Sequence, residues 1–262
     1  MLVVSNGAFK SGSTWLFNIL RDMTNFPPPP EAYLNPDWIN PSIHPDKLAD
    51  FLDQIDLSTE NYLAKNHFKT EAQRELLLSH QNVVVLDIQR DLRDVVVSSY
   101  YHFCRVEGYN ANFGTFYWQK GRHIAHEVRK YHRLWNIVSP RIYVSSYERL
   151  TSDFDSEVEL IGRFLGINLS ERDIWTIKNE TSLNKLRQRY GEQNEKQQFF
   201  RKGAVGDWHN HFSRLMLTDI AKIERQGLEN FRIIDKVIAK LSRNLEAAGG
   251  RYSLIRKEML PE

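Results

Sequence analysis

Residues 3–16, VVSNGAFKSGSTWL, constrain the fold more than any other segment of this 262-residue chain. Residues 2–6 are a short, apolar, β-branched run, which is typical of a buried strand. A helix is predicted directly after the loop, because apolar residues recur there at helical spacing: Trp15, Leu16, Ile19, Leu20 and Met23. Gly7 and Gly12 allow a tight turn whose backbone N–H groups point toward an anion. The segment therefore predicts a strand–loop–helix unit with a phosphate-binding loop at the helix N-terminus.

The alternation of strands and helices continues along the chain. Further strands are predicted at residues 61–67, 82–90 and 141–147, and helices at residues 45–55, 71–80, 94–103, 121–138 and 156–167. Residues 26–42 contain too many prolines for a helix and are predicted to be an extended surface segment. From residue 171 onward the pattern is mostly helical, with a polar break at residues 189–213. No repeat or linker is visible. We therefore predict one α/β domain over residues 1–262, with a central parallel sheet flanked by helices on both faces and a P-loop-like nucleotide site.

The composition limits the partners and the compartment. The formal net charge of +2 is too small to indicate nucleic-acid binding, but it allows a local basic site for a small polyanion. The single cysteine, Cys104, excludes an internal disulfide and a multi-cysteine metal site and favours a reducing compartment. No apolar run approaches the roughly 18 residues that span a bilayer, and no secretory signal is visible. A cytoplasmic protein without membrane contact is predicted.

The glycine spacing of the loop is that of a nucleotide-binding P-loop, G-x-x-x-x-G-K-[ST], but the lysine is displaced. Gly12 is followed by Ser13 and Thr14 rather than by lysine, and Lys10 lies within the loop. A P-loop kinase or NTPase would need the missing lysine and a Mg²⁺-binding carboxylate at a strand end, which Asp87 could imitate. An ordinary strand-to-helix turn is the structural alternative.

A second candidate anion site follows the predicted strand at residues 82–90. Arg90 ends this strand, and Ser98 lies eight residues later, about two helical turns along. Both could reach one phosphate, to which arginine can donate two hydrogen bonds. The alternative is a surface salt-bridge cluster of Arg90 with Asp91, Arg93 and Asp94.

Two further segments carry candidate residues. Residues 201–213, RKGAVGDWHNHFS, combine two adjacent cations with two glycines and suggest a flexible segment that closes on an anion. A solvated basic loop is the alternative. His67 lies at the end of the second predicted strand and could act as a general base, although a lone histidine is more often structural.

Three of these segments, in order, resemble the sulfotransferase family that uses 3′-phosphoadenosine-5′-phosphosulfate (PAPS). FKSGSTW, residues 9–15, is similar to the family's 5′-phosphosulfate loop PKSGTTW, with Phe9 in place of proline and Ser13 in place of threonine. RDLRDVVVSSYYHF, residues 90–103, is similar to the 3′-phosphate segment RNPKDVxVSxYHF. RKGAVGDWHNHFS is similar to RKGxxGDWKNHFT, with His209 in place of lysine. The resemblance runs from about residue 2 to residue 213 and gives Lys10 a place in the loop.

The resemblance implies a role for each matching residue. The 5′-phosphosulfate would be held by Lys10, Ser11, Gly12, Ser13 and Thr14. The nucleotide would lie near Trp15, which stacks on adenine, and near Tyr147, Thr181, Ser182 and Leu183, the last in place of the family's phenylalanine. The 3′-phosphate would be held by Arg90, Ser98, Arg201, Lys202 and Gly203. The predicted catalytic residues are His67 as general base, Lys10 at the leaving phosphate, Lys65 and Ser98.

The resemblance implies transfer of a sulfuryl group from PAPS to a hydroxyl or amine by in-line attack, without a bound metal. The product of the donor would be adenosine 3′,5′-bisphosphate (PAP). A small alcohol, phenol or amine is the expected acceptor, because no long basic track is evident; carbohydrate stays open. A nucleotide- or glycan-binding module that has lost catalysis is a further alternative.

The acceptor pocket and the assembly are less constrained. Residues 26–44, with Tyr33, Trp38 and His44, are predicted to line the pocket, and residues 105–121 to form an aromatic lid. Ordinary surface packing is the alternative for both. The chain begins at its first strand, so an N-terminal extension that shapes the pocket in many family members is expected to be missing. The family's C-terminal dimerisation segment is not recognisable, and the oligomeric state is left open.

Overall fold

A four-stranded parallel sheet lies at the centre of the computed structural model, which describes residues 1–191 and 200–225. Its strands are β1 (Leu2–Gly7), β2 (Tyr62–Lys65), β3 (Val83–Gln89) and β4 (Ile142–Ser146), in the order β2-β1-β3-β4. Leu2 lies opposite both Tyr62 and Val83, and Gly7 lies opposite Ile88. Parallel neighbours need crossover connections, so the carboxyl ends of all four strands lie at one edge of the sheet.

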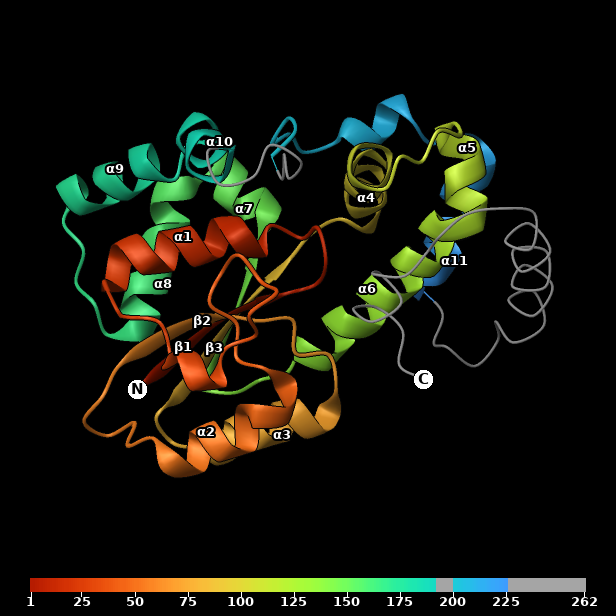
Figure 1. Ribbon diagram of the computed structural model, residues 1–262. Coiled ribbons are helices and arrows are strands. Elements are labelled where there is room, and N and C mark those ends of the chain that lie inside the picture. The colour runs from red at the N-terminus through yellow and green to blue at the C-terminus, as the bar shows by residue number, and fades with distance from the viewer. Residues whose placement is uncertain (192–199, 226–262) are drawn as a thin grey trace.

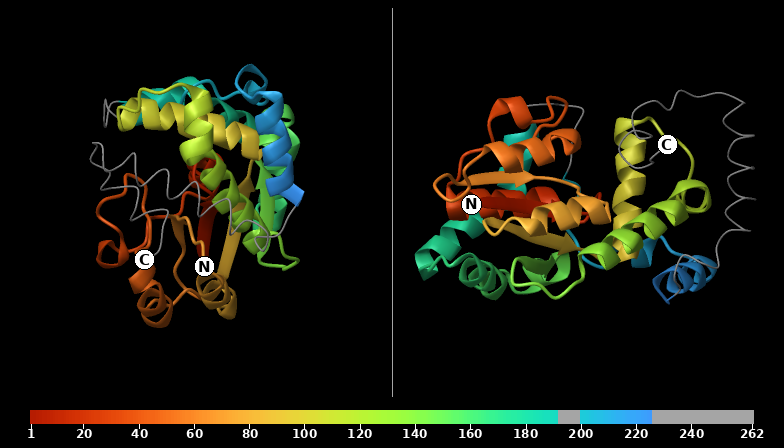
Figure 2. Two further views of the ribbon diagram at one scale, coloured as in Figure 1. Left: turned by 90° about the vertical axis from the view of Figure 1, so that its right-hand side faces the viewer. Right: turned by 90° about the horizontal axis from the view of Figure 1, so that it is seen from below.

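Helices cover both faces of this sheet (Figures 1 and 2). One face packs against α1 (Ser13–Thr24), α7 (Tyr147–Ser152), α8 (Phe154–Leu165) and α9 (Glu171–Glu180). The other packs against α2 (Leu48–Gln54), α3 (Glu71–Ser79) and α6 (Arg122–Trp135). Successive strand residues point to opposite faces, so Val3 belongs to the first core and its neighbours Leu2 and Val4 to the second.

A further group of helices extends to one side of the sheet (Figure 1). It contains α4 (Leu92–Val106), α5 (Phe113–Phe116), the π-helical turn η3 (Tyr117–Gly121) and α11 (Arg214–Arg225). The remaining elements are α10 (Leu183–Gly191) and the 3-10 turns η1 (Glu31–Tyr33), η2 (Pro45–Lys47) and η4 (Asp207–Asn210). No helix among these described residues is long and apolar enough to cross a membrane.

The predicted fold class is confirmed, and each predicted strand and helix has a counterpart. The helix predicted at residues 94–103 forms despite its three valines, because all of them are buried and packing outweighs their poor helix propensity. Asp91 caps this helix by accepting a hydrogen bond from the Arg93 N–H group. The extent of the domain to residue 262 stays a prediction, because residues 226–262 lie outside the described residues.

The aromatic lid predicted at residues 105–121 is wrong for residues 113–121. These residues form α5 and η3, and Phe113, Phe116 and Tyr117 are buried in the core. The Tyr117 hydroxyl donates a hydrogen bond of 2.9 Å to Asp219 on α11. Their apolar area fills the space between α4, α6 and α11, so the aromatic composition reflects packing.

Candidate active site

The loop between β1 and α1 leaves the start of that helix without a side-chain cap. Gly12 stands at the N-cap position with a φ of 102° and offers no capping oxygen. By contrast, α3 and α9 begin with complete capping boxes at Thr70 and Ser170. The Ser11 hydroxyl donates to the Ala8 carbonyl at 2.6 Å and so stabilises the turn itself. The first N–H groups of α1 are therefore oriented as donors for an anion.

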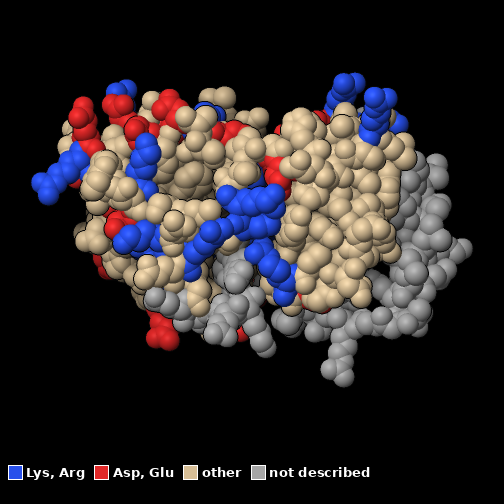
Figure 3. Space-filling model, turned by 90° about the horizontal axis from the view of Figure 1, so that it is seen from above, with Lys and Arg blue, Asp and Glu red and all other residues tan. Residues whose placement is uncertain are grey.

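Lys10 brings a cation into this loop at an energetic cost. Its φ of 62° is left-handed, which is uncommon outside glycine. Burial and the nearby charges of Arg105, Arg90 and Lys65 lower the pKa of Lys10 to about 7. Like charges gathered around a half-buried ammonium are typical of a site whose partner is an anion. On the face of the molecule that Figure 3 shows, Lys and Arg side chains are concentrated near the middle.

Arg90 connects three of the predicted segments. Its guanidinium donates to the carbonyl of Lys10 at 3.4 Å and to that of Ala204 at 3.0 Å, and lies 4.1 Å from the ring centre of Tyr147. The alternative salt-bridge cluster holds only for Arg93 with Asp91, whose Nε and Oδ1 are 2.8 Å apart. Within the described ranges Arg90 forms no ion pair, so no carboxylate there neutralises its positive charge.

The segment from residue 200 to residue 210 is tied to α4 beside the loop. The Asp94 carboxylate accepts hydrogen bonds from the N–H groups of Gly206, at 2.7 Å, and Trp208, at 3.1 Å. Arg201 and Lys202 both pair with Asp207. Burial would raise the pKa of Asp207, but hydrogen bonds from these cations and from Asn210 hold it below its usual range. Residues 192–199, which belong to the predicted polar break, lie outside the described residues.

An aromatic and apolar surface adjoins this cation cluster. Trp15 contacts the ring of Tyr147 edge-on at 5.3 Å and stacks on Phe154 at 6.0 Å. A Cβ atom at Gly203, which has a φ of 65°, would lie 3.5 Å from Leu183 and 3.7 Å from the Tyr147 hydroxyl. The structure therefore brings Trp15, Tyr147, Leu183 and Gly203 together.

The remaining predicted nucleotide residues differ in their exposure. Thr181 is buried, and its hydroxyl donates a hydrogen bond of 2.7 Å to the Ile177 carbonyl, so this proton is used at the end of α9. Ser182 and Ser98 are half-buried, Ser182 beside Leu183 and Ser98 on α4. Ser13 is buried, whereas Thr14 in the first turn of α1 is half-buried.

His67 is tied to the loop by its own ring. Its Nδ1 donates to the carbonyl of Gly7 at 2.5 Å, which leaves Nε2 as the acceptor nitrogen. The Lys65 ammonium lies 3.2 Å from that Nε2. Burial and the Lys65 charge lower the pKa of His67 to about 3, against the opposing effect of the Gly7 hydrogen bond. The imidazole is therefore neutral near pH 7, with its Nε2 lone pair directed toward the Lys65 ammonium.

The predicted acceptor-lining residues separate in the structure. The ring of Trp38 lies 5.2 Å from that of His67, and the Lys65 ammonium lies 5.4 Å from the centre of the Trp38 ring. Tyr33 packs edge-on against Phe51 in the core, and His44 accepts a hydrogen bond from the Asp46 N–H group. Of these three side chains, Trp38 alone contacts the candidate base.

Sequence reasoning missed several residues of the site. Arg105 and His102 both lie near Lys10. The Arg105 charge adds to burial in lowering the pKa of Lys10, and the Lys10 charge adds to burial in lowering the pKa of His102. His102 packs edge-on against Phe9 at 5.2 Å. Arg105 follows Ser98 by seven residues on α4, and this spacing could have indicated it. Asp87 is fully buried and accepts hydrogen bonds from Asn6 and Gln89, so it does not serve as the Mg²⁺ ligand of a P-loop kinase.

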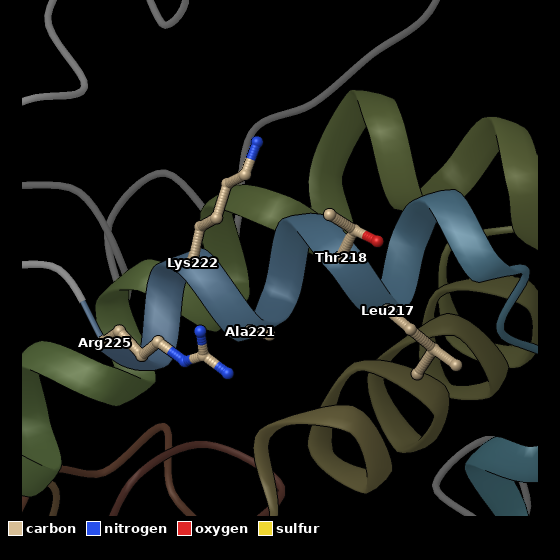
Figure 4. A pocket seen from close by; sticks show the side chains of 5 residues that line it. All are labelled: Leu217, Thr218, Ala221, Lys222 and Arg225. Carbon is tan, nitrogen blue, oxygen red and sulfur yellow. The ribbon is translucent and has the colours of Figure 1, made fainter.

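Two observations concern other parts of the described structure. Within residues 1–191 and 200–225, no three His, Cys, Asp or Glu side chains are grouped as metal ligands. A surface depression runs along α11, lined by residues of that helix alone: Leu217, Thr218, Ala221, Lys222 and Arg225 (Figure 4). None of its residues is among those predicted for the site.

The fold and the candidate site define a P-loop-like α/β protein with a lysine in the loop and a helix N-terminus that has no side-chain cap. The model of the sulfotransferase domain family matches residues 3–232, and the chain belongs to this family. Sulfotransferase 6B1 of Danio rerio is 29% identical over 143 residues, which cover 49% of this chain and 46% of the relative. Human sulfotransferase 1E1 is 27% identical over 180 residues, which cover 55% and 56%. The chain spans about half the length of the curated relatives it matches.

Solved structures show the same fold at lower identity. Mouse sulfotransferase SULT7A1, complexed with PAP, superposes with a TM-score of 0.65 at 16% identity, over 93% of this chain and 88% of the mouse chain. Retinol dehydratase, in complex with androsterone and the inactive cofactor PAP, also gives a TM-score of 0.65, at 19% identity, over 87% and 81%.

Proposed function

We propose that this protein is a sulfotransferase that moves a sulfuryl group from PAPS to a hydroxyl or amine of a small molecule. The observation that carries the proposal is the hydrogen bond from His67 Nδ1 to the Gly7 carbonyl, because it fixes a neutral base at the anion-binding loop that holds Lys10. Membership of the sulfotransferase domain family supports the reaction class.

The residues present fit PAPS as donor. The buried Nε1 of Trp15 and Nε of Arg90 have no hydrogen-bond partner among the described residues, and a buried donor without a partner is costly. Both atoms adjoin the surface where the adenine and the 3′-phosphate are predicted to bind. The uncapped N-terminus of α1 and Lys10 suit the 5′-phosphosulfate. Structures of SULT7A1 and retinol dehydratase are complexes with PAP, which supports this choice of donor.

Different side chains act on the acceptor and on the leaving phosphate. PAPS, when bound, supplies a sulfuryl group attached to a phosphate that can leave. Nε2 of His67 accepts the proton of the acceptor hydroxyl or amine, which takes the place of the Lys65 ammonium beside that nitrogen. Negative charge nearby raises the pKa of His67 from about 3 and so strengthens the base. Lys10 and the N–H groups of α1 stabilise charge that develops on the leaving phosphate, an effect of a few kcal/mol per donor.

A small, partly apolar acceptor suits the neighbourhood of His67. Trp38 covers the imidazole at 5.2 Å, and the adjacent Ile39 is exposed, so an apolar acceptor surface would contact both. Retinol dehydratase is described in complex with androsterone, and one relative from Flaveria bidentis is called flavonol sulfotransferase-like. These names support a small-molecule alcohol or phenol as the class to screen first.

Calorimetric titration tests the donor site before any acceptor is known. PAP should bind tightly without Mg²⁺, and ADP should bind weakly with or without it, because only PAP carries the 3′-phosphate for Arg90 and Arg201. Preference for Mg²⁺-bound ADP would refute the proposal and favour a kinase. Tight PAP binding without turnover on a broad panel of alcohols, phenols and amines would instead favour a binding module.

A further inference from the structure

The position of His67 depends on the backbone of two residues that its side chain does not control. Its ring is held by the Gly7 carbonyl, so the backbone at Gly7 must be fixed for Nε2 to be aimed. Its backbone continues directly into Phe68, whose orientation sets where the imidazole begins. Backbone groups of both residues are hydrogen-bonded by buried side chains that none of the family motifs quoted above contains.

The first of these supports comes from α6. The N–H group of Gly7 donates to the hydroxyl oxygen of Tyr131 at 3.1 Å, and Tyr131 is only 7% exposed. Four residues later on the same face of α6, Trp135 donates its indole N–H to the Phe68 carbonyl at 2.8 Å. One helical face therefore holds the backbone of Gly7 at its N–H group and the backbone of Phe68 at its carbonyl.

The second support comes from the strands. Asn6 accepts a hydrogen bond from the Phe68 N–H group at 3.1 Å and donates one to Asp87 Oδ1 at 3.0 Å. Because the backbone N–H group can only donate, it fixes the amide oxygen of Asn6 toward Phe68 and the amide nitrogen toward Asp87. Asn6 and Asp87 are both fully buried, so the orientation is held away from water.

We propose that Tyr131 and Asn6 are positioning residues that aim Nε2 of His67 by fixing the backbone N–H groups of Gly7 and Phe68. The inference rests on the proposed role of His67 as general base. A displacement of the imidazole of about 1 Å costs up to about a hundredfold in rate, so small shifts of the backbone at either residue would lower turnover. Asp87 acts one step further back, by holding the Asn6 amide.

Tyr131→Phe tests the proposal, with Tyr117→Phe as the matched control. Both substitutions remove a buried hydroxyl that takes part in a hydrogen bond, and Tyr117 bonds to Asp219 rather than to the loop. We expect Tyr131→Phe to lower kcat by about tenfold or more with the PAP dissociation constant unchanged, and Tyr117→Phe to leave both unchanged. Nitrogen NMR of the His67 ring should show Nδ1 protonated in the natural protein and a mixture of tautomers in Tyr131→Phe.

The outcomes separate the two ideas. Equal kcat values for Tyr131→Phe and Tyr117→Phe, with an unchanged His67 tautomer, would overturn the positioning role. If Tyr131→Phe weakened PAP binding by the same factor as it lowered kcat, the positioning role would also be overturned, because the hydroxyl would then stabilise the loop that binds the donor. Absence of sulfuryl transfer in the natural protein would refute the proposed function. The NMR comparison of the His67 tautomer in the natural protein and in Tyr131→Phe would still show whether Tyr131 positions the imidazole.

Discussion

Asp87 makes the stability of this protein depend on pH in a direction opposite to that of most paired carboxylates. It is fully buried and accepts hydrogen bonds from the neutral amides of Asn6 and Gln89, and burial raises its pKa from 3.8 to about 7 despite those hydrogen bonds. Between about pH 4 and pH 7 the unfolded chain has lost this proton and the native state retains it. The native state therefore binds the proton more tightly, and stability falls as pH rises through this window.

The shift of about 3 pKa units corresponds to a contribution of up to about 4 kcal/mol, at about 1.4 kcal/mol per unit. Asp87→Asn should lack this pH dependence. The free energy of unfolding of the variant minus that of the natural protein should therefore increase by up to about 4 kcal/mol between pH 4 and pH 8. Urea denaturation at several pH values measures the difference. Glu157→Gln is the control, because Glu157 is equally buried but paired with Arg149 at 2.8 Å, and breaking that pair should destabilise the protein at pH 7. A constant difference between Asp87→Asn and the natural protein from pH 4 to pH 8 would refute the reasoning.

Three further predictions concern the site. His67→Ala should lower kcat by about 10²- to 10⁴-fold with PAP affinity intact; equal loss of PAP binding would make His67 structural. Gly12→Ala should destabilise the protein by more than the roughly 1–3 kcal/mol of left-handed strain, because its Cβ would lie 2.7 Å from the Tyr147 ring. Gly166→Ala is the control, because Gly166 has a φ of 73° and open space around it, so this variant should show the backbone strain alone. Equal losses of thermal stability in the two variants would contradict the predicted clash at Gly12. PAP binding at pH 8 should be accompanied by proton uptake, because the pKa of Lys10 is lowered to about 7 in the free protein and a bound anion raises it. Calorimetry in buffers of different ionisation enthalpy measures the number of protons taken up. The same number in Lys10→Met would assign the uptake to another group.

The sequence by itself determined the fold class and the outline of the site. Strand–loop–helix alternation predicted the parallel sheet, and its topology brings Lys10, Arg90 and His67 to the same edge, at the carboxyl ends of β1, β3 and β2. Local chemistry was also readable, because helical periodicity and loop glycines depend on residues close together in the chain. The displaced lysine at position 10 was enough to separate this loop from that of a P-loop kinase.

Only the tertiary structure decided how the site is held and how it is charged. Asn6 meets Asp87 across 81 positions of the chain, and Gly7 meets Tyr131 across 124, so no sequence window contains either pair. The lowered pKa values of Lys10 and His67 arise first from burial, and in Lys10 also from the charges of Arg105 and Arg90, which lie far away in the sequence. The aromatic residues 113–121 have the composition of a lid, yet packing against α11 places them in the core. Desolvation and hydrogen bonding depend on neighbours in space, and those neighbours are set only when the chain has folded.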